Sequence, residues 1–492
     1  MEQIRIIFTS DIHGYFYPTD YREKLKKSKG LLHIAQSFHK DGNTLILDGG
    51  DILQGSPFSY YSQMKRMPQI AAELMNKVGY DAVTIGNHDF NYGSQYLRNY
   101  LEQLNAVCIC ENCTEKKTGK SLFPWKIFQM ENGIRVGIVG VVTDFVNLWE
   151  KAENLGQIKI ENAYECVAKV YEEIKEKADL TVCLYHGGME CDIDTEEILE
   201  NTGENEGYKI CKKLGFDLLL TGHQHMPIAG RNIQGTYVVQ NACNADTYHE
   251  IQITFTPNIG IQSKMISASE LPLRDMELPF QKIETDVQNW LDSVVGSVPQ
   301  ALYPEEHLQM ALHGSKLADF INEVQLAYTG ADISCTSLAN QVSGLPEKVT
   351  VRDVLLTYPF PNTLVVLEIT GECLKKALER TAEYFTVKDG SIQISESFLK
   401  PKVEHYNFDF YKGVTYRIDY NKPMGNRISE VRVQKQLISP EKVYHICMNN
   451  YRASGAGGYE MYTHCKIIRQ YGKDMFEVLL EYITNYGRKS EK

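Results

Sequence analysis

Five β-prone segments in the first half of the chain end in the same way, at a turn that carries groups able to bind a metal ion. The clearest is the run 82–85, which stops at Gly86 and leads directly into the triplet Asn87-His88-Asp89. In α/β proteins the turn after the carboxyl end of a strand is the usual place for ligands. Taken alone, such a triplet is more often a capped turn than a site, so its meaning depends on the other segments.

The other four segments repeat this arrangement with different donors. Residues two apart in an extended segment face the same side, so Asp11 and His13 can reach one ion. Asp51 follows two glycines that let the backbone approach a ligand closely, whereas Asp48 before them is better placed to cap the turn. Each of these turns alone could have a purely structural role, but five of them in the same structural context favour a metal-binding role. The candidate metal ligands are Asp11, His13, Asp51, Asn87, His186, His223 and His225.

These seven residues offer only oxygen and nitrogen atoms, which suits two divalent ions if one carboxylate is shared. Asp51 is the natural shared ligand, and the metal is left open among Mn, Zn, Fe and Co. Two such ions activate water and clamp a phosphoryl group. His88 is not needed as a ligand, and as an imidazolium it could neutralise phosphate charge or protonate the leaving oxygen. A consistent partition gives the first ion Asp11, His13, Asp51 and His225, and the second ion Asp51, Asn87, His186 and His223.

Length and composition limit the remaining possibilities. At 492 residues the chain is too long for one core, which predicts at least two domains. A net charge of -12 disfavours a nucleic-acid polymer as the partner. No apolar run approaches a membrane span, no signal segment precedes the first strand, and twelve scattered cysteines do not form a disulfide framework. We therefore expect a cytoplasmic protein without membrane contact, whose oligomeric state the sequence leaves open.

The second half alternates helix and strand signals behind a breaker-rich stretch at 271–300, which we interpret as a linker with a connecting helix. Residues 1–270 and 301–492 are then separate domains. Two aromatic turn segments, 358–362 and 449–459, are prominent in the second of them. Their composition alone favours simple loop anchors, and a stacked aromatic pair around a planar base is the alternative.

The motifs D-x-H, G-G-D, G-N-H-D, H-G-G and G-H-x-H, in this order, resemble those of the calcineurin-like metallophosphoesterases. The resemblance implies an α/β (α+β) chain with a four-layer αββα catalytic domain and a bridging hydroxide as nucleophile. The later segments TGECLKKALE, YPFPNTL and NNYRASG are similar to the C-terminal, substrate-binding domain of the 5'-nucleotidase superfamily. In that family two loops hold the base between aromatic rings, which transfers to Phe360 and Tyr451, with Asn362 as a polar contact.

Three departures from the 5'-nucleotidase pattern resemble the branch of 2',3'-cyclic-nucleotide 2'-phosphodiesterase/3'-nucleotidases. Asn91 stands where 5'-nucleotidases have the Asp that pairs with the catalytic His. The segment 337–344, SLANQVSG, replaces an Asn-Gly-Gly-Ile-Arg loop, and Gly457 replaces an Asp. The resemblance implies a hydrolase of 2',3'-cyclic nucleotides and 3'-nucleotides, with His88 and Asn91 as the catalytic pair. The alternatives are a 5'-nucleotidase or broad nucleotide phosphatase, a non-hydrolysing nucleotide sensor, and a protein phosphatase.

Overall fold

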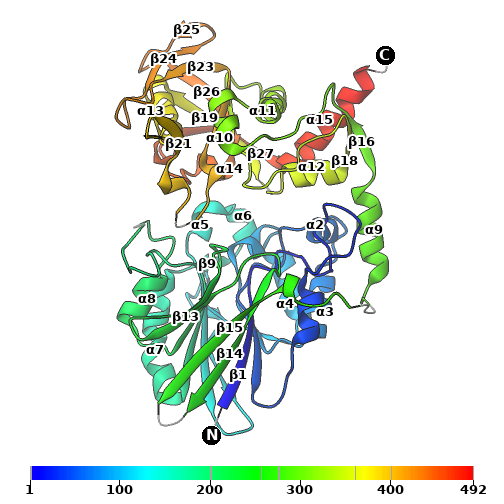
Figure 1. Cartoon of the computed structure of the whole chain (residues 1–492), viewed down its shortest axis with the longest axis vertical. Helices are drawn as coiled ribbons and strands as arrows, with labels where there is room; N and C mark the ends of the chain where they lie inside the picture. The colour runs from blue at the N-terminus through cyan, green and yellow to red at the C-terminus, as the bar shows by residue number, and fades with distance from the viewer. Residues whose placement is uncertain are drawn as a thin grey trace. The chain divides into compact units, whose positions relative to one another are not determined.

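A computed structural model describes residues 3–199, 202–255, 258–274, 278–360, 362–400 and 402–490. The chain divides into two compact units, Met1–Gln288 and Asn289–Lys492, and the division falls within helix α9, Gln281–Leu291 (Figure 1). Residues 275–277 of the predicted linker and Pro361 of the first aromatic segment lie outside the described residues. Within the described ranges, no helix is long and apolar enough to cross a membrane.

Two six-stranded sheets form the centre of the first unit. Their strand orders are β15-β14-β1-β2-β3-β4 and β12-β13-β11-β10-β8-β7. The strands that precede the candidate ligands run parallel to one another within each sheet, so their carboxyl ends lie at one edge. The strands are β1 Gln3–Thr9, β2 Thr44–Asp48, β3 Ala82–Val83, β4 Val107–Cys108, β7 Lys126–Gln129, β8 Arg135–Val142, β10 Leu180–His186, β11 Leu218–Thr221, β12 Ile228–Ile233, β13 Thr236–Gln240, β14 Thr247–Phe255 and β15 Ile259–Ser267.

The two sheets face each other across an apolar core, and helices cover their outer sides, which gives four layers (Figure 1). Because side chains alternate along a strand, Ile6 and Phe8 of β1 both enter this core, where they join Ile138 and Val182 of the second sheet. A small sheet of β5 Cys110–Glu115, β6 Ser121–Phe123 and β9 Ile158–Ile160 completes the strands of this unit. The α-helices are α1 Leu31–Ile34, α2 Pro57–Met64, α3 Pro68–Val78, α4 Ser94–Gln103, α5 Val146–Trp149, α6 Ala152–Leu155, α7 Ala163–Lys177, α8 Gly207–Lys213 and α9.

The local elements of this unit follow their sequence signals closely. Helix α3 has proline in its first turn and Gly79 as a left-handed C-cap at φ 86°, the usual signals for the start and end of a helix. The strand predicted over 82–85 pairs only at Ala82–Val83. It ends early because the backbone bends toward Asp89, whose carboxylate accepts the N–H of Gly86 at 2.8 Å.

The second unit contains a five-stranded sheet of order β22-β17-β26-β19-β27. The buried face of helix α13, Gly371–Ala382, which includes Leu374 and Leu378, packs on this sheet. The strands of the unit are β16 Val294–Ser297, β17 Ile333–Thr336, β18 Lys348–Thr350, β19 Thr363–Thr370, β20 Phe385–Lys388, β21 Ser391–Ile394, β22 Phe410–Lys412, β23 Val414–Ile418, β24 Ile428–Val433, β25 Gln436–Leu437, β26 Val443–Asn449 and β27 Lys466–Asp474. Its α-helices are α10 His307–His313, α11 Lys316–Thr329, α12 Val351–Thr357, α13 Gly371–Ala382, α14 Asn450–Ala453 and α15 Met475–Ser490.

Candidate metal centre and base-binding loops

The four residues predicted to bind the second ion converge around the amide oxygen of Asn87. Asn87 Oδ1 lies 3.1 Å from His186 Nε2 and 2.9 Å from His223 Nδ1. Asp51 Oδ2 lies 3.2 Å from the same His186 nitrogen. These residues follow β2, β3, β10 and β11, so both sheets contribute to one cluster. The cluster offers the mixed nitrogen and oxygen donors that a divalent transition metal accepts.

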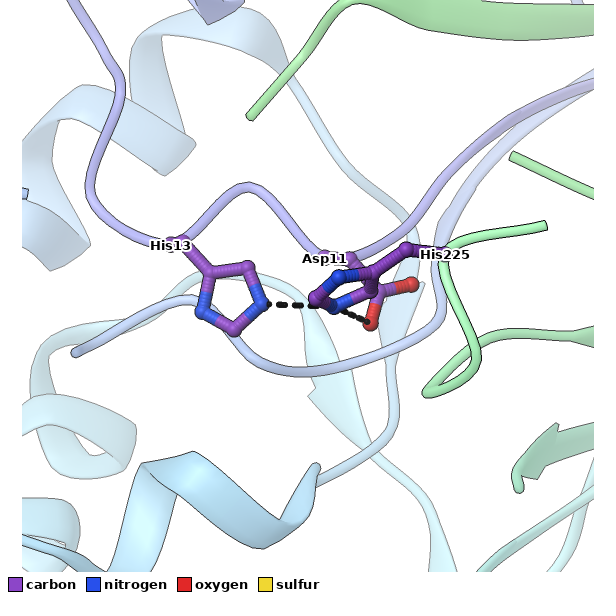
Figure 2. A group of neighbouring side chains, drawn as sticks. All are labelled: Asp11, His13 and His225. Atoms are coloured by element: carbon purple, nitrogen blue, oxygen red, sulfur yellow. Dashed lines mark hydrogen bonds and ion pairs between the residues drawn. The ribbon is translucent and has the colours of Figure 1, made fainter. Parts of the chain in front are cut away.

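The residues predicted to bind the first ion form an adjoining cluster, part of which is drawn in Figure 2. His13 Nε2 lies 3.1 Å from His225 Nε2, and His225 Nε2 lies 3.4 Å from Asp11 Oδ1. Asp51 Oδ2 is 3.8 Å from His13 Nε2, so this one oxygen borders both clusters. The geometry therefore suits Asp51 as the shared ligand. We call the two clusters together the candidate metal centre.

Two buried carboxylate oxygens test whether these residues fit a cation. The side chains of Asp11 and Asp51 are fully buried; among the described residues Asp11 Oδ2 has no hydrogen-bond partner, and Asp51 Oδ2 faces the ring nitrogens of His186 at 3.2 Å and His13 at 3.8 Å. An unpaired carboxylate oxygen in the interior is costly because it has lost its hydration. A divalent ion at the candidate metal centre would satisfy both oxygens. The donor set thus fits a metal site on grounds independent of any sequence motif.

The backbone has positive φ angles, which are unusual for residues other than glycine, at most of the candidate ligands. The left-handed region of φ is sparsely populated by residues other than glycine, and such conformations concentrate at functional sites because the surrounding structure must enforce them. Five of the seven candidate ligands lie in this region: Asp11 at φ 55°, His13 at 50°, Asp51 at 59°, His223 at 69° and His225 at 58°. The turns therefore bend so as to direct these side chains inward.

Backbone carbonyl groups orient two of the histidines. His13 Nδ1 lies 2.7 Å from the carbonyl oxygen of Gln54, and His186 Nδ1 lies 2.6 Å from that of Gly49. A carbonyl oxygen can only accept, so each Nδ1 carries the proton and donates. Each Nε2 is then left to face the candidate metal centre, which is the usual outer support of a metal-binding histidine.

Burial and nearby charge shift the pKa values of two histidines of the candidate metal centre in opposite directions. Burial lowers the pKa of His13 to about 4. Burial also acts to lower the pKa of His186, but the carboxylates of Asp51 and Asp11 and the Gly49 carbonyl together outweigh burial and raise the pKa to about 10. The pKa of Asp51 is held well below its usual value, because His186 and its neighbours outweigh the effect of burial. A cation that binds here replaces the proton on His186, so metal affinity should increase with pH.

Asp89 holds together the two turns that carry Asp51 and Asn87, a role the sequence did not indicate. Its Oδ1 accepts the N–H groups of Ile52 at 2.8 Å and Leu53 at 2.9 Å. Its Oδ2 accepts the N–H groups of Asp51 at 2.9 Å and Gly86 at 2.8 Å. Burial, assisted by the charge of Asp51, raises the pKa of Asp89 to about 6. Asp48 caps its turn as expected, through the N–H of Gly50 at 2.8 Å.

Glu204 is a second residue that the sequence did not indicate. Its Oε1 lies 2.9 Å from His223 Nε2, on the side of the ring opposite Asn87. The indole ring of Trp149 stacks on the same imidazole, with centroids 5.5 Å apart and planes inclined by 20°. A carboxylate behind a metal-binding histidine fixes its tautomer and increases its basicity. No motif contains Glu204, so only the folded chain reveals it.

We expect Glu204→Gln to weaken metal binding by about 10- to 100-fold, because the carboxylate behind His223 is lost while the residue volume is kept. Titration of the apoprotein with Mn²⁺ or Zn²⁺ measures this affinity. The matched control is the exposed Glu197→Gln on the same loop, which should bind metal like the parent protein. An unchanged affinity in Glu204→Gln would remove Glu204 from the candidate metal centre.

His88 and Asn91, the predicted catalytic pair, lie directly against the candidate metal centre. His88 Nδ1 and Asn91 Oδ1 are 2.8 Å apart. The backbone N–H of His88 donates to Asp51 Oδ1 at 2.7 Å, and its ring meets the His13 ring edge to face at 5.4 Å. The imidazole is therefore placed beside the donors while its own Nδ1 is occupied by Asn91.

The register of the second unit brings the two aromatic segments together. Leu364 of β19 pairs with Asn449 of β26, and the N–H of Thr363 donates to Asn450 Oδ1 at 2.9 Å. The segments before β19 and after β26 are therefore neighbours. The Phe360 ring is 39% exposed, which leaves it open to a ligand. Of the other predicted base-binding residues, the backbone carbonyl of Asn362 accepts the N–H of Met475 at 2.8 Å, and Tyr451 is half-buried.

Arg452 organises the second aromatic segment and explains one departure from the 5'-nucleotidase pattern. Its guanidinium is buried and forms an ion pair with Asp409 at 2.9 Å. A Cβ at Gly457, where φ is 74°, would lie 2.4 Å from Arg452 Nη1 and 2.2 Å from Asn407 Oδ1. The loop therefore has no room for the aspartate that other members carry there.

Comparison with known proteins identifies the family. Residues 4–227 match the family "Calcineurin-like phosphoesterase", and residues 294–464 match "5'-nucleotidase, C-terminal domain". A 5'-nucleotidase-like protein from Staphylococcus aureus, solved in complex with α-ketoglutarate, is 32% identical, with a TM-score of 0.93 over 99% of this chain and 97% of its own. The chain belongs to the 5'-nucleotidase family of calcineurin-like phosphoesterases. The predicted family and two-domain fold are confirmed, and the chain is a phosphoester hydrolase whose family uses divalent metal ions.

Two curated relatives are more distant in sequence. The trifunctional nucleotide phosphoesterase protein YfkN of Bacillus subtilis is 25% identical over 98% of this chain, which spans 38% of the length of YfkN. A 2',3'-cyclic-nucleotide 2'-phosphodiesterase/3'-nucleotidase of Haemophilus influenzae is 24% identical over 92% of this chain and 80% of its own length. These two relatives, which align with nearly the whole chain, are thus named for different sets of nucleotide esterase activities.

Proposed function

We propose that the chain hydrolyses 2',3'-cyclic nucleotides to 3'-nucleotides, and 3'-nucleotides to nucleosides, at a centre of two divalent ions. The observation that carries this proposal is the Asn91 amide beside His88, where 5'-nucleotidases have a carboxylate. A cyclic diester bears one negative charge and a terminal phosphate close to two. A site in which the His88 ring nitrogen Nδ1 contacts an amide instead of a carboxylate suits the less charged ester. The names of the Haemophilus influenzae and Yersinia enterocolitica relatives support this choice.

The roles follow from the atoms that each residue presents. The seven candidate ligands would hold the two ions, with Asp51 shared, in the partition predicted from the sequence. Bound ions lower the pKa of water and neutralise charge on phosphoryl oxygens. Asn91 accepts from Nδ1 of His88, so when the ring is an imidazolium its second proton lies on Nε2, which can stabilise or protonate the departing 2'-oxygen. Metal identity among Mn, Zn, Fe and Co depends on supply as much as on the donors.

Initial rates on 2',3'-cAMP, 3'-AMP and 5'-AMP with added Mn²⁺ test the proposal. We expect kcat/KM for 2',3'-cAMP to exceed that for 5'-AMP at least tenfold. A clear preference for 5'-AMP would instead support the alternative of a 5'-nucleotidase, which the Staphylococcus aureus structure favours. Tight nucleotide binding without turnover in metal-replete protein would identify a sensor.

The base-binding role is tested by removing the aromatic rings. Base stacking contributes about 1–3 kcal/mol per ring, so Phe360→Ala and Tyr451→Ala should each increase KM for the nucleotide about 5- to 100-fold. Hydrolysis of p-nitrophenyl phosphate, which has no base, should change by less than twofold. Tyr303→Ala, which removes an exposed ring elsewhere in the second unit, is the control. Unchanged nucleotide KM in both variants would favour the alternative of a protein phosphatase.

The cytoplasmic location expected from the sequence also stays a proposal. It can be tested at Cys110 and Cys113, whose buried sulfur atoms lie 3.2 Å apart. Thiols this close persist most readily in a reducing compartment. Mass spectrometry of the alkylated native protein should find both thiols free.

A further inference from the structure

The catalytic pair continues to a third residue that no motif includes. Asn91 Nδ2 donates to Glu150 Oε2 at 2.7 Å, while Asn91 Oδ1 faces His88 Nδ1 at 2.8 Å. Glu150 directly follows helix α5 and is half-buried, 59 residues away from Asn91 in the sequence. A carboxylate therefore stands behind His88 after all, with one amide group between them.

The hydrogen bonds around Glu150 determine which atom donates and which accepts in the hydrogen-bonded series Glu150–Asn91–His88. Its Oε1 accepts the N–H of Lys151 at 2.7 Å and Asn154 Nδ2 at 2.8 Å. The donors at Lys151 and Asn154 have fixed directions, and an ionised carboxylate only accepts, so Glu150 also presents an acceptor to Asn91. Asn91 must then present its NH₂ to Glu150 and its oxygen to His88. His88 Nδ1 must in turn carry a proton, which leaves Nε2 to face the candidate metal centre.

The support of Asn91 includes its backbone. Asn154 Nδ2, which donates to Glu150, also lies 3.1 Å from the backbone carbonyl oxygen of Asn91 and donates to it. The same short segment carries Trp149, whose ring stacks on His223. Trp149 thus contacts the candidate metal centre, while Glu150 and Asn154 contact Asn91 of the catalytic pair.

We propose that Glu150 is a positioning residue, which fixes the Asn91 amide and thereby the tautomer and orientation of the His88 ring. The inference rests on the proposed role of His88. In the 5'-nucleotidase pattern a carboxylate contacts the histidine directly, whereas here the carboxylate acts through Asn91. A purely structural role, as a cap for helix α6, would use Glu150 Oε1 and the N–H of Lys151 and would not require the bond to Asn91.

Exchanging the amide and the carboxylate tests this arrangement. In Glu150→Gln the introduced oxygen must accept from Lys151 and Asn154, so the introduced NH₂ meets the NH₂ of Asn91. The Asn91 amide then turns over and presents a donor to His88 Nδ1. In Asn91→Asp two carboxylates meet at the position of the 2.7 Å bond. In the double variant the introduced amide donates to the introduced carboxylate, which again accepts from His88.

We expect each single variant to lower kcat at least tenfold with KM within twofold, and the double variant to recover kcat to within threefold of the parent protein. Glu150→Gln should add no further loss in a His88→Ala background. Glu153→Gln, an exposed glutamate of the same segment, is the control and should keep full activity. ¹⁵N NMR of histidine-labelled protein should report the Nδ1–H tautomer of His88 in the parent protein and its loss in Glu150→Gln.

The rates are measured on whichever of 2',3'-cAMP, 3'-AMP and 5'-AMP the parent protein hydrolyses fastest, so the two proposals are separable. A preference for 5'-AMP overturns the proposed function, while the tautomer and the exchange experiment still decide the role of Glu150. Parental kcat and tautomer in Glu150→Gln, or a double variant no better than the single variants, overturn the role of Glu150 alone.

Discussion

Replacing Asp51 by asparagine is expected to abolish hydrolysis, with kcat/KM lower by about 10³-fold or more, because the carboxylate that we propose as the shared ligand of two ions is lost. Asparagine has nearly the same size and shape as aspartate, so we attribute the expected loss of activity to the replacement of a carboxylate oxygen by an NH₂ group. Asp51 Oδ1 accepts the N–H of His88 at 2.7 Å, and an amide must use its oxygen for that bond. The NH₂ group then takes the position of Oδ2, 3.2 Å from His186 Nε2 and 3.8 Å from His13 Nε2. A donor in that position cannot bind a cation.

Metal analysis and kinetics on the same sample separate this effect from misfolding. Asp51→Asn should retain the melting temperature of the metal-free parent protein and contain less than half of its metal after reconstitution. Asp41→Asn is the matched control, since Asp41 is exposed and its oxygen caps a turn in which asparagine serves equally well. Full metal content with substantial turnover in Asp51→Asn would contradict the assignment of Asp51 as the shared ligand.

The second large effect is expected on stability. In Asp89→Asn the NH₂ group would face two of the four N–H groups that the carboxylate now accepts, so at least two buried donors lose their partner. Each such loss costs about 1–3 kcal/mol, so two losses give about 2–6 kcal/mol in total. The turns that carry Asp51 and Asn87 should separate as a result, and activity should fall with stability.

Calorimetry of the full chain measures this loss as a decrease of roughly 5 to 20 °C in the melting temperature of the first unit. Asp194→Asn provides the comparison, because its ion pair with Arg231 is exposed and contributes less than about 1 kcal/mol. If Asp89→Asn melted like the parent protein, Asp89 would not be the residue that holds the two turns.

The candidate metal centre was predictable from the sequence because its residues directly follow strands. Parallel strands carry their carboxyl ends to one edge, so five short motifs were sufficient to place Asp11, Asp51 and His186 in one cluster. The tight turns at these motifs also account for the positive φ angles, which aspartate and histidine adopt more readily than most other residues with a side chain. The family and the two-domain fold followed from the same motifs and from the C-terminal segments.

The supporting residues were not predictable, because each acts through a contact between distant segments. Glu204 reaches His223 from a loop 19 residues earlier, and Glu150 reaches Asn91 from the end of a short helix. Glutamates in loops are common, and nothing in their neighbours distinguishes these two. Asp89 was visible as part of the Asn87-His88-Asp89 triplet, but its bonds to four N–H groups depend on how two turns approach each other.

A time course of 2',3'-cAMP hydrolysis by the Mn²⁺-reconstituted protein, followed by ³¹P NMR, tests the proposed function most directly. We predict that 3'-AMP appears first, as the 2'-oxygen leaves, and that inorganic phosphate follows as the 3'-ester is hydrolysed. Accumulation of 2'-AMP, or an unchanged cyclic nucleotide in a sample that rapidly releases phosphate from 5'-AMP, would contradict it.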